Sequence, residues 1–153
     1  MSESIRHRGS TIENYSPWLH RAAVLYVILT FIVIISGGNV TSRGAGMSVP
    51  DGFTVYGYFL WAFPIDRWVG NIFHEHVHRL VGSVIGITAL AVAVWTAIVE
   101  RRRTVRMIAF VAALMVLVQG ILGALRVNQI STTLAVVHGV HAQMILCMTV
   151  WLP

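Results

Sequence analysis

Four long apolar stretches follow one another along the chain and set its architecture. A helix needs about 20 apolar residues to cross a bilayer. We therefore expect transmembrane helices over residues 22–40, 72–99, 107–126 and 133–152. These spans and their connections take up nearly the whole length, so we expect a single domain over residues 1–153 with no separate soluble module. The predicted fold class is an all-α membrane protein whose four helices form a bundle.

The connection between the first two spans, residues 41–70, differs from a simple polar loop. It contains several glycines and prolines that break regular structure, and five aromatic residues between Tyr56 and Phe63. A loop of this length is usually either functional or disordered, and the aromatic residues argue against disorder. We expect this segment to lie against the membrane interface or to cover a pocket.

Composition supports a membrane location and gives an orientation. Hydrophobic residues make up 56% of the chain and charged residues 11%, against roughly 45–50% and about 25% in soluble domains. All basic residues are arginines, and the run Arg101–Arg106 is predicted to be cytoplasmic together with the N-terminus. The predicted localisation is therefore multi-pass in the cell (plasma or inner) membrane. A nucleic-acid partner is excluded, because it would need a basic face on a soluble domain.

Features at single positions add little. Cys147 lies within an apolar span and cannot form an intramolecular disulfide. The first apolar run begins at Ala22 and is too long for a cleavable signal peptide. The chain stops at Pro153 without a polar tail, which we interpret as a truncation.

Ionisable residues cluster at the predicted outer end of the second span. The run contains His74, Glu75, His76, His78 and Arg79. An ionisable residue within a membrane span is costly and indicates a functional site by default. The cluster is therefore the main candidate for chemistry in this chain.

Helix geometry singles out one histidine pair. His78 in the second span and His138 in the fourth both lie roughly 8–9 Å below the predicted outer boundary, at 1.5 Å per residue. The two helices run in the same direction, so two imidazoles at one depth suit axial ligation of a haem iron on both faces. At 100° per residue Glu75 lies about 60° from His78, whereas His76 points to the far side.

The other histidines have weaker assignments. His74 shares a helix face with His78, and His141 shares a face with His138. We expect His74, His76 and His141 to cap or line the mouth of the pocket. His141 lies one turn deeper than His138 and is an alternative ligand.

Three kinds of site compete for this cluster. Residues 74–78 satisfy H-E-x-x-H, the zinc motif of metalloproteases, but the pattern arises easily in a histidine-rich stretch. A di-iron carboxylate site is excluded, because it needs about four carboxylates and Glu75 is the only acid in a span. A haem-sized pocket near the outer side explains the depth match. Arg79 and Arg126 would bind the propionates in that site, or would extend to the interface as snorkelling residues.

Five motifs in order resemble the haem A synthase family over about residues 18–145. They are Gly37-Gly38-x-Val40-Thr41, Gly46-Met47-Ser48-Val49-Pro50-Asp51, Glu75-x-x-His78-Arg79, Gln119-Gly120-x-x-Gly123-x-x-Arg126-Val127 and His138-Gly139-x-x-Ala142-Gln143. Each motif alone is weak, but five in order form a specific signal.

This resemblance implies an oxidoreductase of eight helices in two similar halves, of which this chain matches the N-terminal half. It implies that this half binds the substrate haem O and that the second half holds haem b. The reaction oxidises the C8 methyl of haem O to the formyl of haem A through successive hydroxylations. The family's histidine pair falls on His78 and His138, and its pocket glutamate, the expected catalytic residue, falls on Glu75.

The resemblance also suggests partners: haem O, membrane lipid, and haem O synthase or other cytochrome oxidase assembly factors, with homo-oligomers as an option. The chain departs from the family at Gly52, where many members have tryptophan, and it has no cysteine pair in the outer loop. A bis-histidine b-type haem protein for electron transfer is the alternative function. That function does not require Glu75, so this residue discriminates between the two.

Overall fold

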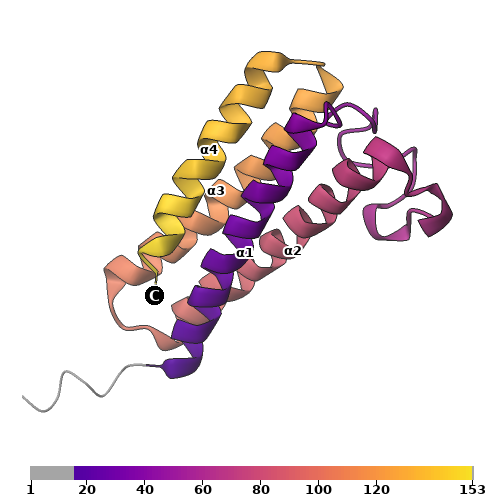
Figure 1. Ribbon diagram of the computed structural model, residues 1–153. Coiled ribbons are helices and arrows are strands. Elements are labelled where there is room, and N and C mark those ends of the chain that lie inside the picture. The colour runs from indigo at the N-terminus through magenta and orange to yellow at the C-terminus, as the bar shows by residue number, and fades with distance from the viewer. Residues whose placement is uncertain (1–15, 153) are drawn as a thin grey trace, which may run out of the picture.

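The computed structural model describes residues 16–152, and four long helices account for most of them (Figure 1). They are α1 (Pro17–Ser42), α2 (Gly70–Val99), α3 (Arg103–Asn128) and α4 (Thr132–Val150). All four are long and apolar enough to cross a membrane, so the predicted all-α membrane class is confirmed. Residues 1–15, which are predicted to be cytoplasmic and carry Arg6 and Arg8, lie outside the described residues.

Local capping sets several helix ends beyond the predicted span limits. The hydroxyl of Ser16 accepts a hydrogen bond from the Leu19 amide at 3.3 Å, and Pro17 occupies the first turn of α1. Proline is favoured there because its missing N–H would have no partner within the helix. Ser131 caps α4 in the same way through the Leu134 amide.

The helices form a bundle in which each has two neighbours. α1 contacts α2 and α4, and α3 contacts the same two helices. α2 and α4 therefore lie diagonally opposite each other. Several of the fully buried side chains are alanines, which let helix backbones approach closely; they are Ala23, Ala89, Ala93, Ala109, Ala112 and Ala124.

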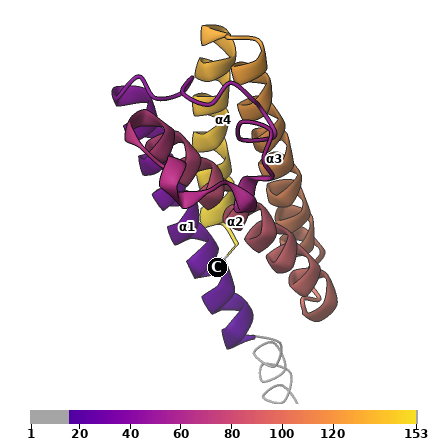
Figure 2. The same cartoon turned by 90° about the vertical axis from the view of Figure 1, so that its right-hand side faces the viewer.

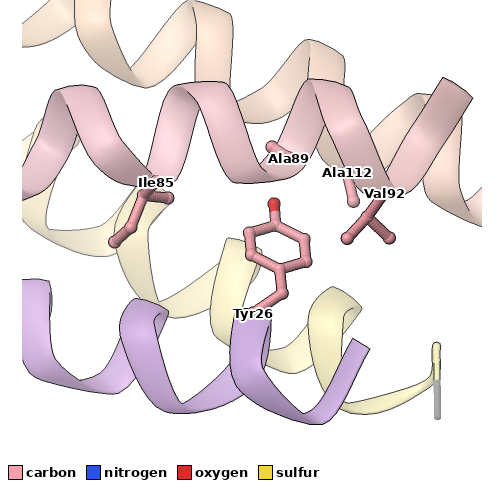
Figure 3. Close-up of a cluster of buried hydrophobic side chains, with 5 residues drawn as sticks. All are labelled: Tyr26, Ile85, Ala89, Val92 and Ala112. Carbon is pink, nitrogen blue, oxygen red and sulfur yellow. The ribbon is translucent and has the colours of Figure 1, made fainter. Parts of the chain in front are cut away.

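A tyrosine lies at the centre of a cluster of buried side chains. Tyr26 of α1 extends toward α2 and packs with Ile85, Ala89, Val92 and, from α3, Ala112 (Figure 3). The residue is 1% exposed, and its hydroxyl has no hydrogen-bond partner among the described residues. The ring supplies packing, while the buried hydroxyl is an unsatisfied polar group.

The connection between α1 and α2 folds back against the flank of α2 (Figures 1 and 2). It contains two short 3₁₀ helices, η1 (Leu60–Ala62) and η2 (Ile65–Arg67). We call residues 43–69 the outer loop, and the end of the bundle that carries it the outer end. Gly70 then starts α2 with φ of +52°, a left-handed conformation that favours glycine.

Internal bonds give the outer loop a defined shape. Asp51 accepts hydrogen bonds from the Gly57 amide at 2.7 Å and from the Thr54 hydroxyl at 2.9 Å. These bonds hold the pKa of the Asp51 carboxyl below its usual range. The Tyr56 hydroxyl donates to the Ser48 carbonyl at 2.6 Å. The loop is therefore tied together by polar contacts as well as by its apolar side chains.

Candidate functional site

The two predicted ligands lie on diagonal helices, and each rests on a glycine of the next helix. A Cβ added to Gly37 of α1 would lie 3.1 Å from Cε1 of His78 on α2. A Cβ added to Gly123 of α3 would lie 3.1 Å from Cε1 of His138 on α4. Both contacts are tighter than ordinary van der Waals packing. These two glycines, which we call the glycine cradles, leave room for the imidazole rings.

Both imidazoles also carry a polar atom without a partner. The Nδ1 atoms of His78 and His138 are buried, and neither has a hydrogen-bond partner among residues 16–152. A buried polar atom in this state costs roughly 1–3 kcal/mol. Such a cost is typical of a functional site rather than of a core designed for stability. The matched rings and their cradles therefore fit a group held between α2 and α4, such as a haem iron.

Gln119 of α3 orients the second histidine of α4. Its Nε2 donates to the His138 carbonyl at 3.0 Å, and its Oε1 lies 2.7 Å from Nδ1 of His141. A carbonyl can only accept a hydrogen bond, so the NH₂ end of the Gln119 side chain must face the His138 carbonyl and Oε1 must face His141. Nδ1 of His141 is therefore the protonated nitrogen. Gln119 belongs to a motif of the sequence, but the motif does not indicate this role.

The remaining histidines of the cluster have different surroundings. His74 lies with Nδ1 3.4 Å from Nδ2 of Asn39 on α1. His76 is fully buried under the outer loop, edge-on to Phe63 and Trp68 at centroid distances of 5.1 and 4.5 Å. Neither ring nitrogen of His76 has a partner among the described residues.

The H-E-x-x-H motif does not assemble a zinc site. Within residues 16–152, no three side chains from His, Cys, Asp and Glu lie close enough to hold a metal ion. Glu75 points to the outer loop, while His74 contacts α1. The geometry therefore does not favour the metalloprotease reading.

Glu75 and Arg79 form a buried ion pair that holds the outer loop. Oε1 of Glu75 lies 2.7 Å from Nη2 of Arg79, and Oε2 accepts from the Val49 amide at 2.9 Å. Glu75 is only 2% exposed. Arg79 in turn donates to the carbonyls of Val49, Asp51 and Thr54. We call this network the loop clamp.

Arg126 of α3 extends the clamp to the beginning of the loop. Its Nη2 donates to the Gly46 carbonyl at 3.2 Å, and a Cβ on Gly46 would lie 2.5 Å from the same nitrogen. Both predicted propionate partners, Arg79 and Arg126, therefore bind loop carbonyls. Their role toward a propionate stays a prediction.

Gly52 explains one departure from the resembled family. Its amide donates to Oδ1 of Asn128 at 2.9 Å, and an added Cβ would lie 2.6 Å from the Ala124 carbonyl oxygen. No side chain fits between this part of the loop and the end of α3. The loop of this chain thus packs more closely on α3 than a tryptophan at this position would allow.

A cavity of about 430 Å³ lies at the outer loop and not between the two predicted ligands. Its lining consists of loop residues and the beginning of α2, namely Tyr56, Phe63, Asp66, Arg67, Val69 and Ile72. The haem-sized pocket between α2 and α4 therefore stays a prediction.

The fold and the site together define a class: a four-helix membrane protein with two diagonal histidines beneath a clamped outer loop. The chain belongs to the COX15-CtaA family, described as cytochrome oxidase assembly protein, whose family model matches residues 5–150. The confirmed family agrees with the resemblance drawn from the motifs.

Three curated relatives share this similarity, and each is named heme A synthase. The protein of Alkalihalophilus pseudofirmus is 28% identical over 131 residues, which is 81% of this chain and 43% of the relative. That of Exiguobacterium sp. is 33% identical over 95 residues, covering 61% and 30%. That of Shouchella clausii is 29% identical over 107 residues, covering 69% and 35%. The chain thus spans less than half the length of these relatives. No solved structure matches the chain.

Proposed function

We propose that this chain forms the haem O-binding half of a haem A synthase, an oxidoreductase that converts the C8 methyl of haem O to a formyl group. Membership of the family and the names of the three relatives support this reaction. The observation that carries the proposal is the pair of histidines on diagonal helices, each in a glycine cradle. A flat macrocycle with a central iron takes one axial ligand on each face, and histidines on two diagonal helices would supply both.

In this proposal the histidine pair binds the iron and Glu75 takes part in the chemistry. His78 and His138 hold the iron from α2 and α4, and bound haem O supplies the methyl group that is oxidised. Glu75 lies one turn before His78, and each of its oxygens keeps a second lone pair beyond the clamp bonds. When an oxidant takes up electrons from the methyl group, Glu75 would accept the protons released and stabilise positive charge there.

The two arginines serve the loop and the substrate together. A guanidinium has five N–H donors, and within the described residues Arg126 uses one of its N–H groups, on Gly46. The remaining donors bind a propionate at the outer end. Arg79 acts mainly through the clamp, since its two terminal nitrogens already donate to three carbonyls and Glu75.

We also infer the orientation of this half in the membrane and its partners. The chain lies in the plasma or inner membrane with its N-terminus and Arg101–Arg106 in the cytoplasm, in agreement with the positive-inside rule. The greater length of the relatives leaves room for a second half that binds haem b. Haem O synthase and cytochrome oxidase assembly factors are the expected partners.

Cavity variants with added imidazole test the ligand pair. We expect His78→Gly and His138→Gly each to lose the six-coordinate low-spin spectrum when the purified protein is loaded with haem O. Free imidazole should restore it, because it replaces the missing ring in a site that still folds. The control His20→Gly lies near the beginning of α1, far along the helix from the Gly37 cradle, and should keep the spectrum. A low-spin spectrum in His78→Gly without imidazole would refute the assignment.

A further inference from the structure

The outer loop presents a large apolar surface that faces away from the protein. Five of its apolar side chains are between 56% and 80% exposed; they are Phe53, Phe59, Trp61, Ile65 and Val69. Exposed apolar patches of this extent mark an interaction with another protein or with a membrane. We call this set the loop face.

The loop face does not arise from poor folding of the loop. On the inner side of the loop, Val49, Val55 and Phe63 are almost completely buried and form their own cluster. The loop clamp fixes the same segment to α2 and α3 through Arg79 and Arg126. The apolar side chains of the loop face are therefore held outward on a rigid support.

The position of the loop indicates what covers this face. In both views the loop lies on the flank of the bundle beside the first turns of α2, and it does not reach beyond the α3–α4 turn (Figures 1 and 2). Phe63 packs on His76, in the second turn of α2. The 30 residues of α2 span about 45 Å, against about 30 Å for the hydrocarbon core. Because α2 is longer than the core, we place its first turns, which carry Glu75 and Arg79, at the depth of the lipid headgroups.

The side chains at this depth have the composition of a membrane interface. Trp61 and Tyr58 belong to the residue types that are enriched at this boundary. Arg67 lies over the Tyr58 ring, 5.4 Å from its centroid, and Asp66 precedes it in the chain. Phe73, in the first turn of α2, is also exposed, and its ring lies 6.4 Å from that of Trp68 at the end of the loop.

We propose that the loop face inserts into the outer-end leaflet and anchors the loop beside α2. The occupant is the boundary between lipid headgroups and acyl chains, because the face lies at that depth and carries apolar and aromatic residues of the types found there. This anchoring holds the loop on the flank of α2 from the lipid side, as the clamp does from the protein side. The inference does not depend on the proposed oxidation of haem O.

Site-directed spin labelling measures the environment of this face directly. Single cysteines at Phe59 and Ile65, in a Cys147→Ala background, are labelled with a nitroxide and reconstituted into phosphatidylcholine vesicles. We expect oxygen to relax both labels more strongly than a water-soluble nickel chelate does. The control Gln129→Cys, in the exposed α3–α4 turn, should show the opposite preference.

Two results would overturn the proposal. Strong relaxation by the nickel chelate at positions 59 and 65, as at position 129, would place the face in water. Weak relaxation by both reagents would show that a protein surface, such as a second copy, covers it. If the cysteine variants do not fold, quenching by brominated lipid serves instead. Wild-type fluorescence should be quenched more than that of Trp61→Phe, and equal quenching would refute insertion.

Discussion

Replacing Glu75 by Gln tests whether the loop clamp depends on a charged group. The amide keeps the size of the side chain but has one acceptor, so either the Val49 amide or Arg79 then faces an NH₂ group. Removing one partner of a buried ion pair costs 3–5 kcal/mol. Since 1.4 kcal/mol corresponds to a tenfold change, a loss of about 3 kcal/mol raises the population of detached loop by about 100-fold.

Hydrogen exchange measured by mass spectrometry on a peptide covering residues 46–55 reports this detachment. We expect protection of the Val49 amide to fall by about 100-fold in Glu75→Gln. The matched control is Glu100→Gln, which removes another acid that pairs with an arginine within residues 16–152, at the opposite end of the bundle. This control should leave the loop peptide unchanged. Unaltered protection in Glu75→Gln would refute the clamp.

The same variants separate the clamp from the chemistry. Arg79→Gln releases the loop while leaving a carboxylate at position 75, so it should reduce protection as much as Glu75→Gln does. If Glu75 accepts protons, pigment analysis by liquid chromatography should show haem O accumulating far more in Glu75→Gln than in Arg79→Gln. Equal accumulation in the two variants would assign Glu75 to the clamp alone.

Three further predictions follow from single contacts. Gly123→Val should displace His138 and abolish low-spin haem binding, whereas Gly120→Val, at a position where an added Cβ meets nothing within 4 Å, should not; retained binding in the former would contradict the cradle. Tyr26→Phe should leave thermal stability unchanged or raise it by about 1 kcal/mol, because it removes an unsatisfied hydroxyl; a large loss would reveal a missed partner. Hydrogen bonds from Arg102 lower the pKa of Glu100 to about 2. Its stabilisation is therefore complete above its ordinary pKa and is lost as pH falls toward 2. The difference in melting temperature between wild type and Glu100→Gln should shrink over that range.

The paired cradles give the site an internal symmetry. Gly37 and His78 on α1 and α2 repeat the relation of Gly123 and His138 on α3 and α4. Each helix pair thus supplies one ligand and the space for it. The two rings lie on different helix pairs, so a shift of one imidazole is not compensated by movement of the other. The proposed haem geometry therefore requires a small residue at both cradles.

The apolar pattern determined the membrane class, and helix periodicity determined which histidines share a depth and a face. Both are local properties: an apolar run of this length can be satisfied only in a bilayer, and 1.5 Å and 100° per residue fix the spacing within a helix. The sequence therefore predicted His78 and His138 as a pair and Glu75 beside them. The predicted helix ends were less accurate, because the side-chain cap of Ser16 and the left-handed backbone of Gly70 decide where α1 and α2 begin.

Only the tertiary structure decided what the polar side chains contact. Glu75 meets the Val49 amide 26 positions away, and Arg126 meets the Gly46 carbonyl 80 positions away. Gln119 reaches His141 on another helix. These partners are backbone groups or distant side chains, and a carbonyl or an amide looks the same at every position of a sequence. Periodicity predicts the face on which a residue lies, whereas the packing of the chain decides which group it meets there.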